Sequence, residues 1–300
     1  MFPTNEGSIR LFRLWGVNVF LHWSWFVIAY LEVEWRGRAF SSPIYNIIEY
    51  LALFGIVLMH EFGHAMACRQ VGGQADRIVL WPLGGVAYVA PPQRPGAQLW
   101  SIAAGPLVNV VLIPILFVIG ILQAQSGVGG SDLRTLLGML LTINIVLLIF
   151  NLLPIFPLDG GQILRSLLWF KFGRGKSLKI ATIIGFIGVA GLAVYAFQMR
   201  SIWMGIMTAF IFMNCRQGWE QAKAINQMES LPRRSGFRCP ACNNKPLKGE
   251  FWPCPRCRTT FDAFATEGQC PNCRGILAEV QCADCGRMHP VEDWVPTRDQ

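Results

Sequence analysis

The sequence predicts an all-α polytopic membrane protein with about six transmembrane helices and a short membrane-associated β-hairpin, followed by a small cysteine-rich domain. Three observations support this class. The 300 residues are 53% hydrophobic and only 15% charged, whereas soluble domains carry about a quarter charged residues. Several apolar runs approach the roughly 20 residues that a helix needs to cross a bilayer. Eight of the ten cysteines follow residue 219, where the sequence becomes polar.

Six apolar segments are predicted to span the membrane: residues 17–33, 46–69, 98–123, 135–153, 180–198 and 201–217. The first could also be a signal peptide, but Glu32 and Glu34 follow it and no small-residue cleavage site is visible. We therefore interpret it as a retained span. Residues 77–90 predict two short strands around a Pro-Leu-Gly-Gly turn, and an interfacial loop without substrate contact is the alternative.

The composition divides the chain into a membrane domain (1–219), a linker (220–237) and a cysteine-rich domain (238–300). Residues 1–219 contain 15 Lys+Arg and 8 Asp+Glu, and the remainder contains 11 and 10. With the N-terminus inside, eleven basic residues of the membrane domain fall on one face and four on the other. Because basic residues concentrate on the cytoplasmic side, we expect a multi-pass protein of the cell membrane with its N-terminus and tail in the cytoplasm. The nearly balanced charge of the tail argues against a nucleic-acid partner.

The second predicted span contains the motif HEFGH, which places ionisable groups inside an apolar run. On a helix, His60 and His64 share one face, so both imidazoles can bind one metal ion. Glu61 lies beside them and can accept a proton from a water molecule. The alternative is a chance pair of core histidines. That alternative must also explain three ionisable groups at membrane depth, which are costly and usually functional.

A catalytic zinc ion takes three protein ligands and keeps one position open, so a third ligand is expected elsewhere in the membrane domain. Glu49 lies on the same predicted helix but about three turns from His60, too far to share an ion. Asp159 lies in NLLPIFPLDGG (151–161), whose prolines and glycines must break the helix. Broken backbone at membrane depth is tolerated where it lines a cavity or is buried in protein. Asp159 is thus either the third ligand or a charge at the cytoplasmic end of the fourth span.

These motifs together resemble the site-2 protease family of intramembrane zinc metalloproteases. The resemblance rests on HEFGH (60–64), NLLPIFPLDGG (151–161), AAGPLVN (103–109) and PLGG (82–85). The opening segment, 8–26, also resembles the start of the compact bacterial members, so the likeness covers roughly residues 8–217. No PDZ-like or CBS-like regulatory domain is recognised, and the cysteine-rich tail occupies that place.

The resemblance implies an activity and a set of site residues. The expected zinc ligands are His60, His64 and Asp159, and Glu61 is the expected catalytic base. Structural or substrate-handling roles are expected for Asn109 and Asn151, and substrate contact for Gly84 and Gly85. The alternative for Asn151 is that its amide only stabilises the break after the fourth span. The implied reaction is hydrolysis of peptide bonds in or near transmembrane segments of membrane-anchored proteins. Since the carbonyl groups of a helical substrate are hydrogen-bonded, the substrate must unwind, and it could then add as a strand to the hairpin edge.

The tail contains four C-x-x-C knuckles: Cys239/Cys242, Cys254/Cys257, Cys270/Cys273 and Cys282/Cys285. Two knuckles complete a four-thiolate zinc site, so four knuckles predict a double zinc ribbon with two structural zinc ions. Sequential pairing of the knuckles is our first expectation, and pairing the inner two and the outer two is the alternative. Redox-active dithiols are a further alternative. Zinc ribbons bind proteins or nucleic acids and the motif does not say which, so a protein is one possible partner of the tail.

Two other functions are consistent with parts of the sequence. A catalytically silent membrane scaffold would recruit partners through the tail, although the intact HEFGH and its carboxylate partner argue against it. A metal transporter would use the same ligands for transit. It would be expected to carry further polar residues along the other spans, which the sequence does not show.

Overall fold

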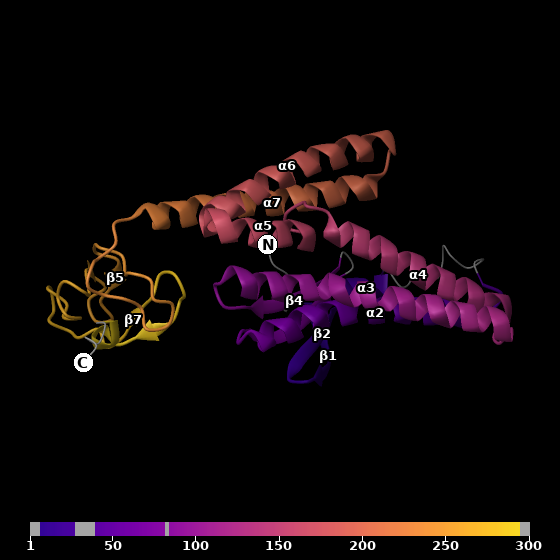
Figure 1. The fold of residues 1–300 in the computed structure, drawn as a ribbon, viewed down its shortest axis with the longest axis horizontal. Coiled ribbons are helices and arrows are strands. Elements are labelled where there is room, and N and C mark those ends of the chain that lie inside the picture. Colours follow the sequence, from indigo (N-terminus) through magenta and orange to yellow (C-terminus); the bar gives the residue numbers. More distant parts are fainter. Residues whose placement is uncertain (1–6, 28–39, 82–83, 295–300) are drawn as a thin grey trace. The chain divides into compact units, whose positions relative to one another are not determined.

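The computed structural model of the protein describes residues 7–27, 40–81 and 84–294. The chain divides into two compact units, Met1–Lys223 and Ala224–Gln300. The first unit is mostly helical, and Figure 1 shows its long helices running beside one another. Its helices are α2 (Pro43–Gln70), α3 (Pro95–Ser126), α4 (Gly130–Leu152), α5 (Asp159–Phe172), α6 (Arg174–Gln198) and α7 (Ile202–Ser230), the last of which crosses into the second unit.

The predicted class of helical membrane protein is confirmed. Among the described residues, α2, α3, α4 and α6 are long and apolar enough to cross a membrane, and they contain four of the six predicted spans. Most of the predicted span 201–217 is helical, within α7, which is long enough to cross a bilayer but is not among the helices that are apolar enough to do so. Its apolar stretch ends at Met213, before Asn214 and Arg216, and about 20 residues are needed to cross a bilayer.

The prediction of a helical span at residues 17–33 is wrong for its first part. Residues Val17–His22 form strand β2, which pairs in an antiparallel manner with β1 (Ser8–Leu14). Helical conformation begins only at Ser24, and residues 28–33 lie outside the described part of the chain. The side chains of Val17 and Val19 are fully buried, which is the alternation expected of a strand with one face against a core.

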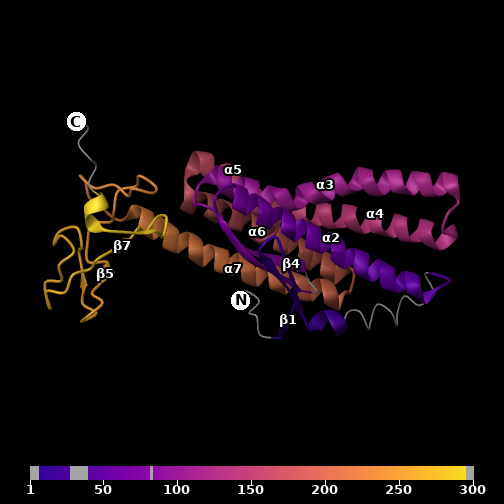
Figure 2. The ribbon, with the colours of Figure 1, turned by 90° about the horizontal axis from the view of Figure 1, so that it is seen from below.

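The predicted hairpin is confirmed and belongs to a larger sheet. Strands β3 (Gln74–Trp81) and β4 (Gly84–Ala90) are antiparallel, and β2 pairs with β3 in parallel. The strand order is β1-β2-β3-β4, so β4 forms one edge of the sheet. Figure 2 shows the sheet beside α2, where Phe62 and Ala65 pack into its core. The sheet therefore covers the helix that carries the HEFGH motif.

Helices α2 and α3 approach each other closely at a glycine. A Cβ atom on Gly63 would lie 2.6 Å from the backbone oxygen of Ala104 and 2.9 Å from the side chain of Val108. Small residues at such contacts allow two helix backbones to pack at short range. Gly63 lies between Glu61 and His64, so this contact holds the motif against α3.

The helical conformation is interrupted between α4 and α5, as the sequence predicts. Two glycines make the first turn of α5 fit against this break. A Cβ atom on Gly160 would lie 2.2 Å from the Leu152 oxygen, and one on Gly161 would lie 2.5 Å from the Phe156 nitrogen. The side chain of Gln162 also donates a hydrogen bond to the Pro157 oxygen at 2.9 Å. These contacts fix Asp159 at the first position of α5.

The second unit is built from short strands around a small core. Strands β5 (Trp252–Pro253) and β6 (Thr260–Phe261) pair with each other, as do β7 (Val280–Gln281) and β8 (Met288–His289). The 3-10 helix η1 (Val291–Trp294) closes the described chain. The core combines cysteines with aromatic and aliphatic side chains: Leu247, Trp252, Phe261, Phe264, Val280 and Trp294.

The predicted linker, 220–237, is helical up to Ser230 and then packs within the second unit. The nitrogen of Lys248 donates to the Pro232 oxygen at 2.8 Å. The guanidinium of Arg233 forms two bonds to Asp284, at 2.5 and 3.0 Å, and this carboxylate raises the pKa of Arg233. The residues after Ser230 are therefore part of the fold of the tail.

Candidate active site and metal centres

Helix α2 brings the three ionisable residues of HEFGH into the interior. The side chains of His60, Glu61 and His64 are all buried. The two imidazoles meet edge to face, and their Nε2 atoms are 3.1 Å apart. This is the arrangement expected for histidines four positions apart on one helix face.

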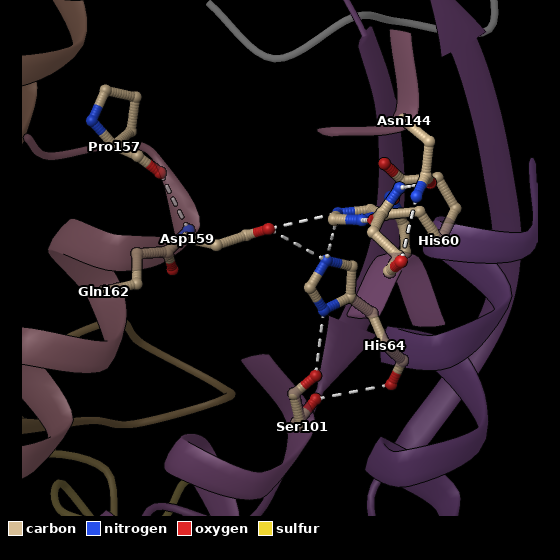
Figure 3. Close-up of polar contacts among 10 residues, drawn as sticks. His60, His64, Ser101, Asn144, Pro157, Asp159 and Gln162 are labelled. Atoms are coloured by element: carbon tan, nitrogen blue, oxygen red, sulfur yellow. Dashed lines mark hydrogen bonds and ion pairs between the residues drawn. The ribbon is translucent and has the colours of Figure 1, made fainter. Parts of the chain in front are cut away.

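Asp159 completes this group from the start of α5. Its Oδ2 atom is 3.0 Å from the Nε2 of His60 and 3.4 Å from the Nε2 of His64. Figure 3 shows the carboxylate pointing across to both imidazoles. The structure thus brings together the three residues that the sequence predicts as ligands of one ion. All three donor atoms lie within 4.8 Å of one another.

The hydrogen bonding of His64 shows that this group fits a metal ion. The Nδ1 of His64 is 2.9 Å from the Ser101 backbone oxygen, which can only accept, so Nδ1 carries the proton. In the neutral imidazole, Nε2 then presents a lone pair toward the carboxylate of Asp159. Two acceptors facing each other in a buried site repel unless a cation lies between them. Two imidazole nitrogens and one carboxylate oxygen form a typical donor set for catalytic zinc.

Gly105 on α3 provides the space for the His64 imidazole. A Cβ atom at this position would lie 2.2 Å from the Nε2 of His64 and 2.4 Å from its Cε1. The segment AAGPLVN (103–109) thus packs closely against the motif helix, and the space beside Gly105 is taken by the His64 side chain.

Strand β4 covers the predicted base. The backbone nitrogen of Ala87 donates a hydrogen bond to the Oε2 of Glu61 at 2.8 Å. A Cβ atom on Gly85 would lie 2.3 Å from the Cγ of Glu61. Gly85 is therefore in direct contact with the base, whereas Gly84 begins the strand and pairs with Trp81. The roles of both glycines in substrate binding stay predictions.

Asn109 contacts the metal-site residues, and Asn151 lies at another place on the fold. The Oδ1 of Asn109 is 2.6 Å from the Nδ1 of His60, and its Nδ2 donates to the Oδ1 of Asn144 at 2.8 Å. Asn151 lies in the last turn of α4 and is half-buried, and its substrate-handling role stays a prediction.

Three partners of the site were not found from the sequence. Ser101 accepts through its backbone oxygen and Ala87 donates through its backbone nitrogen, so neither side chain could have indicated its role. Asn144 did give a signal, because it is an amide inside the apolar span 135–153. Its partner, Asn109, is 35 positions away on another helix.

The eight knuckle cysteines gather into two groups of four. The first and fourth knuckles come together, with Cys239 and Cys285 Sγ atoms 3.7 Å apart and those of Cys242 and Cys282 at the same distance. The second and third knuckles form the other group, with Sγ distances of 3.5 Å between Cys254 and Cys273 and 3.6 Å between Cys257 and Cys270. Sequential pairing, our first expectation, is wrong for this structure, which has the alternative arrangement.

The chemistry of these groups fits a metal ion of the zinc type. Four sulfur atoms at mutual contact match a tetrahedral thiolate site. Hydrogen bonding by Thr259 lowers the pKa of the Cys257 thiol to about 6, so this sulfur is ready to bind a cation at neutral pH. The tail thus provides two candidate structural centres beside the candidate catalytic one.

A buried histidine pair with a glutamate beside it on the membrane-length helix α2, and a carboxylate that reaches the pair from the start of α5, are typical of membrane-embedded metallopeptidases. The family model described as "Peptidase family M50" matches residues 48–131 and 118–195. These ranges include HEFGH and the LDG segment. The chain belongs to this family, the site-2 protease family.

Known proteins agree with this assignment. A zinc metalloprotease of Methanocaldococcus jannaschii is 31% identical over 224 residues, and a putative zinc metalloprotease of Synechocystis is 31% identical over 244 residues. Each match covers 75% of this chain and 63% of the relative. The chain thus spans under two thirds of the length of these curated relatives. The solved structure titled "Site-2 Protease from Methanocaldococcus jannaschii" is similar with a TM-score of 0.51 and 30% identity, covering 71% of this chain and 95% of that one.

The contact between Gly105 and His64 predicts how the metal site can be lost without changing a ligand. We expect Gly105→Ala to remove the zinc ion of the histidine cluster, because the new methyl group would occupy the place of the imidazole. Gly120→Ala is the matched control on the same helix, since a Cβ atom there meets nothing within 4 Å. Zinc per chain, measured by elemental analysis of both purified variants, checks this. Full zinc in Gly105→Ala would contradict the geometry.

The pairing of the knuckles predicts that two variants, each lacking four cysteines, lose different numbers of zinc ions. Serine at all four cysteines of the first and fourth knuckles should remove one zinc ion, because these cysteines form one group. Serine at all four of the first and second knuckles should remove two ions, since each group then keeps only two thiolates. Elemental analysis of the two variants distinguishes the arrangements. The reverse outcome would restore sequential pairing.

Proposed function

We propose that the protein is an intramembrane zinc metalloendopeptidase that hydrolyses peptide bonds in or near transmembrane segments of membrane-anchored proteins. The observation that carries this proposal is that Asp159, at the start of α5, meets His60 and His64 beside Glu61 in the buried part of the apolar helix α2. Family membership supports the same reaction. The relatives are named as zinc metalloproteases.

Each residue of the site has a distinct role in this proposal. His60, His64 and Asp159 hold the zinc ion, which when bound polarises the scissile carbonyl group and makes water a better nucleophile. Glu61 accepts the proton of the attacking water and transfers it to the leaving amine. The Ala87 N–H holds one oxygen of this carboxylate, which leaves the other oxygen to exchange the proton.

The sheet supports a route for the substrate. Strand β4 lies at the edge of the sheet, and the N–H of Ala87 on this strand is directed to Glu61. An unwound substrate that added to this edge would run past the catalytic base, with its backbone hydrogen bonds satisfied by the strand. This arrangement favours a substrate bound as an extended segment over an intact helix.

The tail has a separate role in the proposal. Two four-thiolate zinc ions would stabilise a unit whose aromatic core is small, because metal binding supplies folding free energy to such domains. Together with the catalytic ion this gives three zinc ions per chain, one for each group of candidate ligands. The protein surface of the tail would then recruit a protein partner, and a nucleic-acid partner is disfavoured by its balanced charge.

Variants of the base and variants of the zinc ligands should fail in two different ways. Glu61→Gln keeps size but cannot accept a proton, so we expect three zinc ions per chain and cleavage reduced by at least ~10². His64→Ala and Asp159→Ala each remove a ligand, so we expect two zinc ions per chain. The measurements are elemental analysis of the purified chains and a comparison of membrane-anchored proteins in cells that carry each variant.

Glu49→Gln is the matched control for the base. It makes the same chemical change on the same helix, about 16 Å along its axis from His60 at ~1.5 Å per residue. Precursors should accumulate in cells with Glu61→Gln and not in cells with Glu49→Gln. Normal processing by Glu61→Gln would remove the protease assignment and favour a scaffold. Three zinc ions per chain in Asp159→Ala would show that another residue is the third ligand.

The orientation of the chain in the membrane is also part of the proposal. The bias of basic residues counted over the predicted spans supports a cytoplasmic N-terminus and tail. A reporter fused after Gly218 should then be cytoplasmic, and one inserted near Gly130, in the connection between α3 and α4, should lie outside. Enzymatic reporters that are active on only one side of the membrane check both positions. Opposite signals would invert the topology.

A further inference from the structure

The two buried amides of Asn109 and Asn144 form a connection that ends at a zinc ligand. Asn109 lies on α3 and Asn144 on α4. Asn144 is fully buried and Asn109 is 1% exposed, so bulk water does not compete for their hydrogen bonds. The orientation of each amide can therefore be read from its partners.

A backbone oxygen fixes the orientation of Asn144. The side chain of this residue is 2.9 Å from the backbone oxygen of Asn109. Because a carbonyl oxygen only accepts, the atom that faces it must be the amide nitrogen, Nδ2. The other end of the Asn144 amide, Oδ1, then faces the side chain of Asn109 at 2.8 Å (Figure 3).

The same argument continues to His60. The Oδ1 of Asn144 only accepts, so the atom of Asn109 that faces it is Nδ2, and Oδ1 of Asn109 faces the imidazole. That oxygen is 2.6 Å from the Nδ1 of His60, so Nδ1 carries the proton. The Nε2 of His60 is left with its lone pair, 3.0 Å from the Oδ2 of Asp159.

We propose that Asn144 is a positioning residue of the zinc site, which selects the metal-binding tautomer of His60 through Asn109. Without Asn144, the Asn109 amide can turn over at no steric cost and present its NH₂ group to Nδ1. His60 would then favour the tautomer with its proton on Nε2, which cannot bind a metal. His64 does not need such a device, since a backbone oxygen fixes its tautomer directly.

This inference rests on the proposed zinc site and is tested by zinc affinity. Asn144→Leu removes the donor and the acceptor of this side chain and keeps its number of heavy atoms and its branching, so we expect the affinity of the histidine cluster for zinc to fall ~10- to 100-fold, the usual cost of losing a hydrogen-bonding partner of a metal ligand. The full chain is titrated with a zinc chelator. At each concentration the zinc content is compared with that of His64→Ala, whose remaining zinc belongs to the tail.

A second substitution separates tautomer control from packing. In Asn109→Asp, both carboxylate oxygens accept, so the Nδ1 proton of His60 is held whichever way the group turns. Adding Asn144→Leu to Asn109→Asp should therefore leave zinc affinity unchanged or raise it. A rise is expected because, in Asn109→Asp, the Oδ1 of Asn144 faces a carboxylate oxygen and repels it, and the leucine removes this repulsion. Thr142→Leu is the matched control on α4, because Thr142 is exposed and its hydroxyl donates to Gly138 of its own helix.

Each outcome supports or overturns the inference. Loss of affinity in Asn144→Leu alone, and no loss when it is combined with Asn109→Asp, supports it. An equal loss in both backgrounds would show that Asn144 only packs, and wild-type affinity in Asn144→Leu would show that it has no role. If the wild-type chain and His64→Ala hold the same zinc, it is the proposed zinc site that fails.

Discussion

Burying two imidazoles and a carboxylate among apolar helices carries a desolvation cost that must be recovered inside the protein. The structure brings the three groups to one point, where one cation would satisfy all of them. His60 and His64 come from α2 and Asp159 from α5, 99 positions from His60. Because Asp159 must reach both histidines, the interrupted segment after α4 must lie next to the HEFGH part of α2.

The need to bring these three groups together explains several glycines. Gly63 brings α2 against α3, Gly105 leaves room for the imidazole, and Gly160 lets the first turn of α5 reach the broken segment. Each contact is shorter than a side chain could accept. Glycines therefore allow the short distances between backbones, and the side chains of His60, His64 and Asp159 bridge the remaining space between α2 and α5. Strand β4 obeys the same rule, since Gly85 approaches Glu61 too closely for any Cβ atom.

The sequence identified the three side chains that meet at the site better than it identified their hydrogen-bonding partners, for a physical reason. Asp159 was identifiable because prolines and glycines around it must break a helix at membrane depth. Ser101 and Ala87 act through backbone atoms, which leave no mark on residue identity. The strand at Val17–His22 was mistaken for part of a span because an apolar run does not distinguish a buried strand from a buried helix. Its pairing with β3 lies more than fifty positions away. The knuckles show the same limit, because a C-x-x-C motif specifies a half-site and not its partner.

The nested order of the knuckles affects how the tail closes. Cys242 and Cys282 are 40 positions apart, and the inner group, in which Cys254 and Cys273 are 19 positions apart, lies wholly within that interval. The cost in chain entropy of joining two ends grows only with the logarithm of the loop, about 0.6 kcal/mol for each doubling. Once the inner group has formed, the outer one closes an effectively shorter loop. During synthesis from the N-terminus, the inner group is complete when Cys273 emerges, whereas the outer one must wait for Cys285, close to the end of the chain. The nested pairing of the knuckles therefore favours formation of the inner group before the outer one.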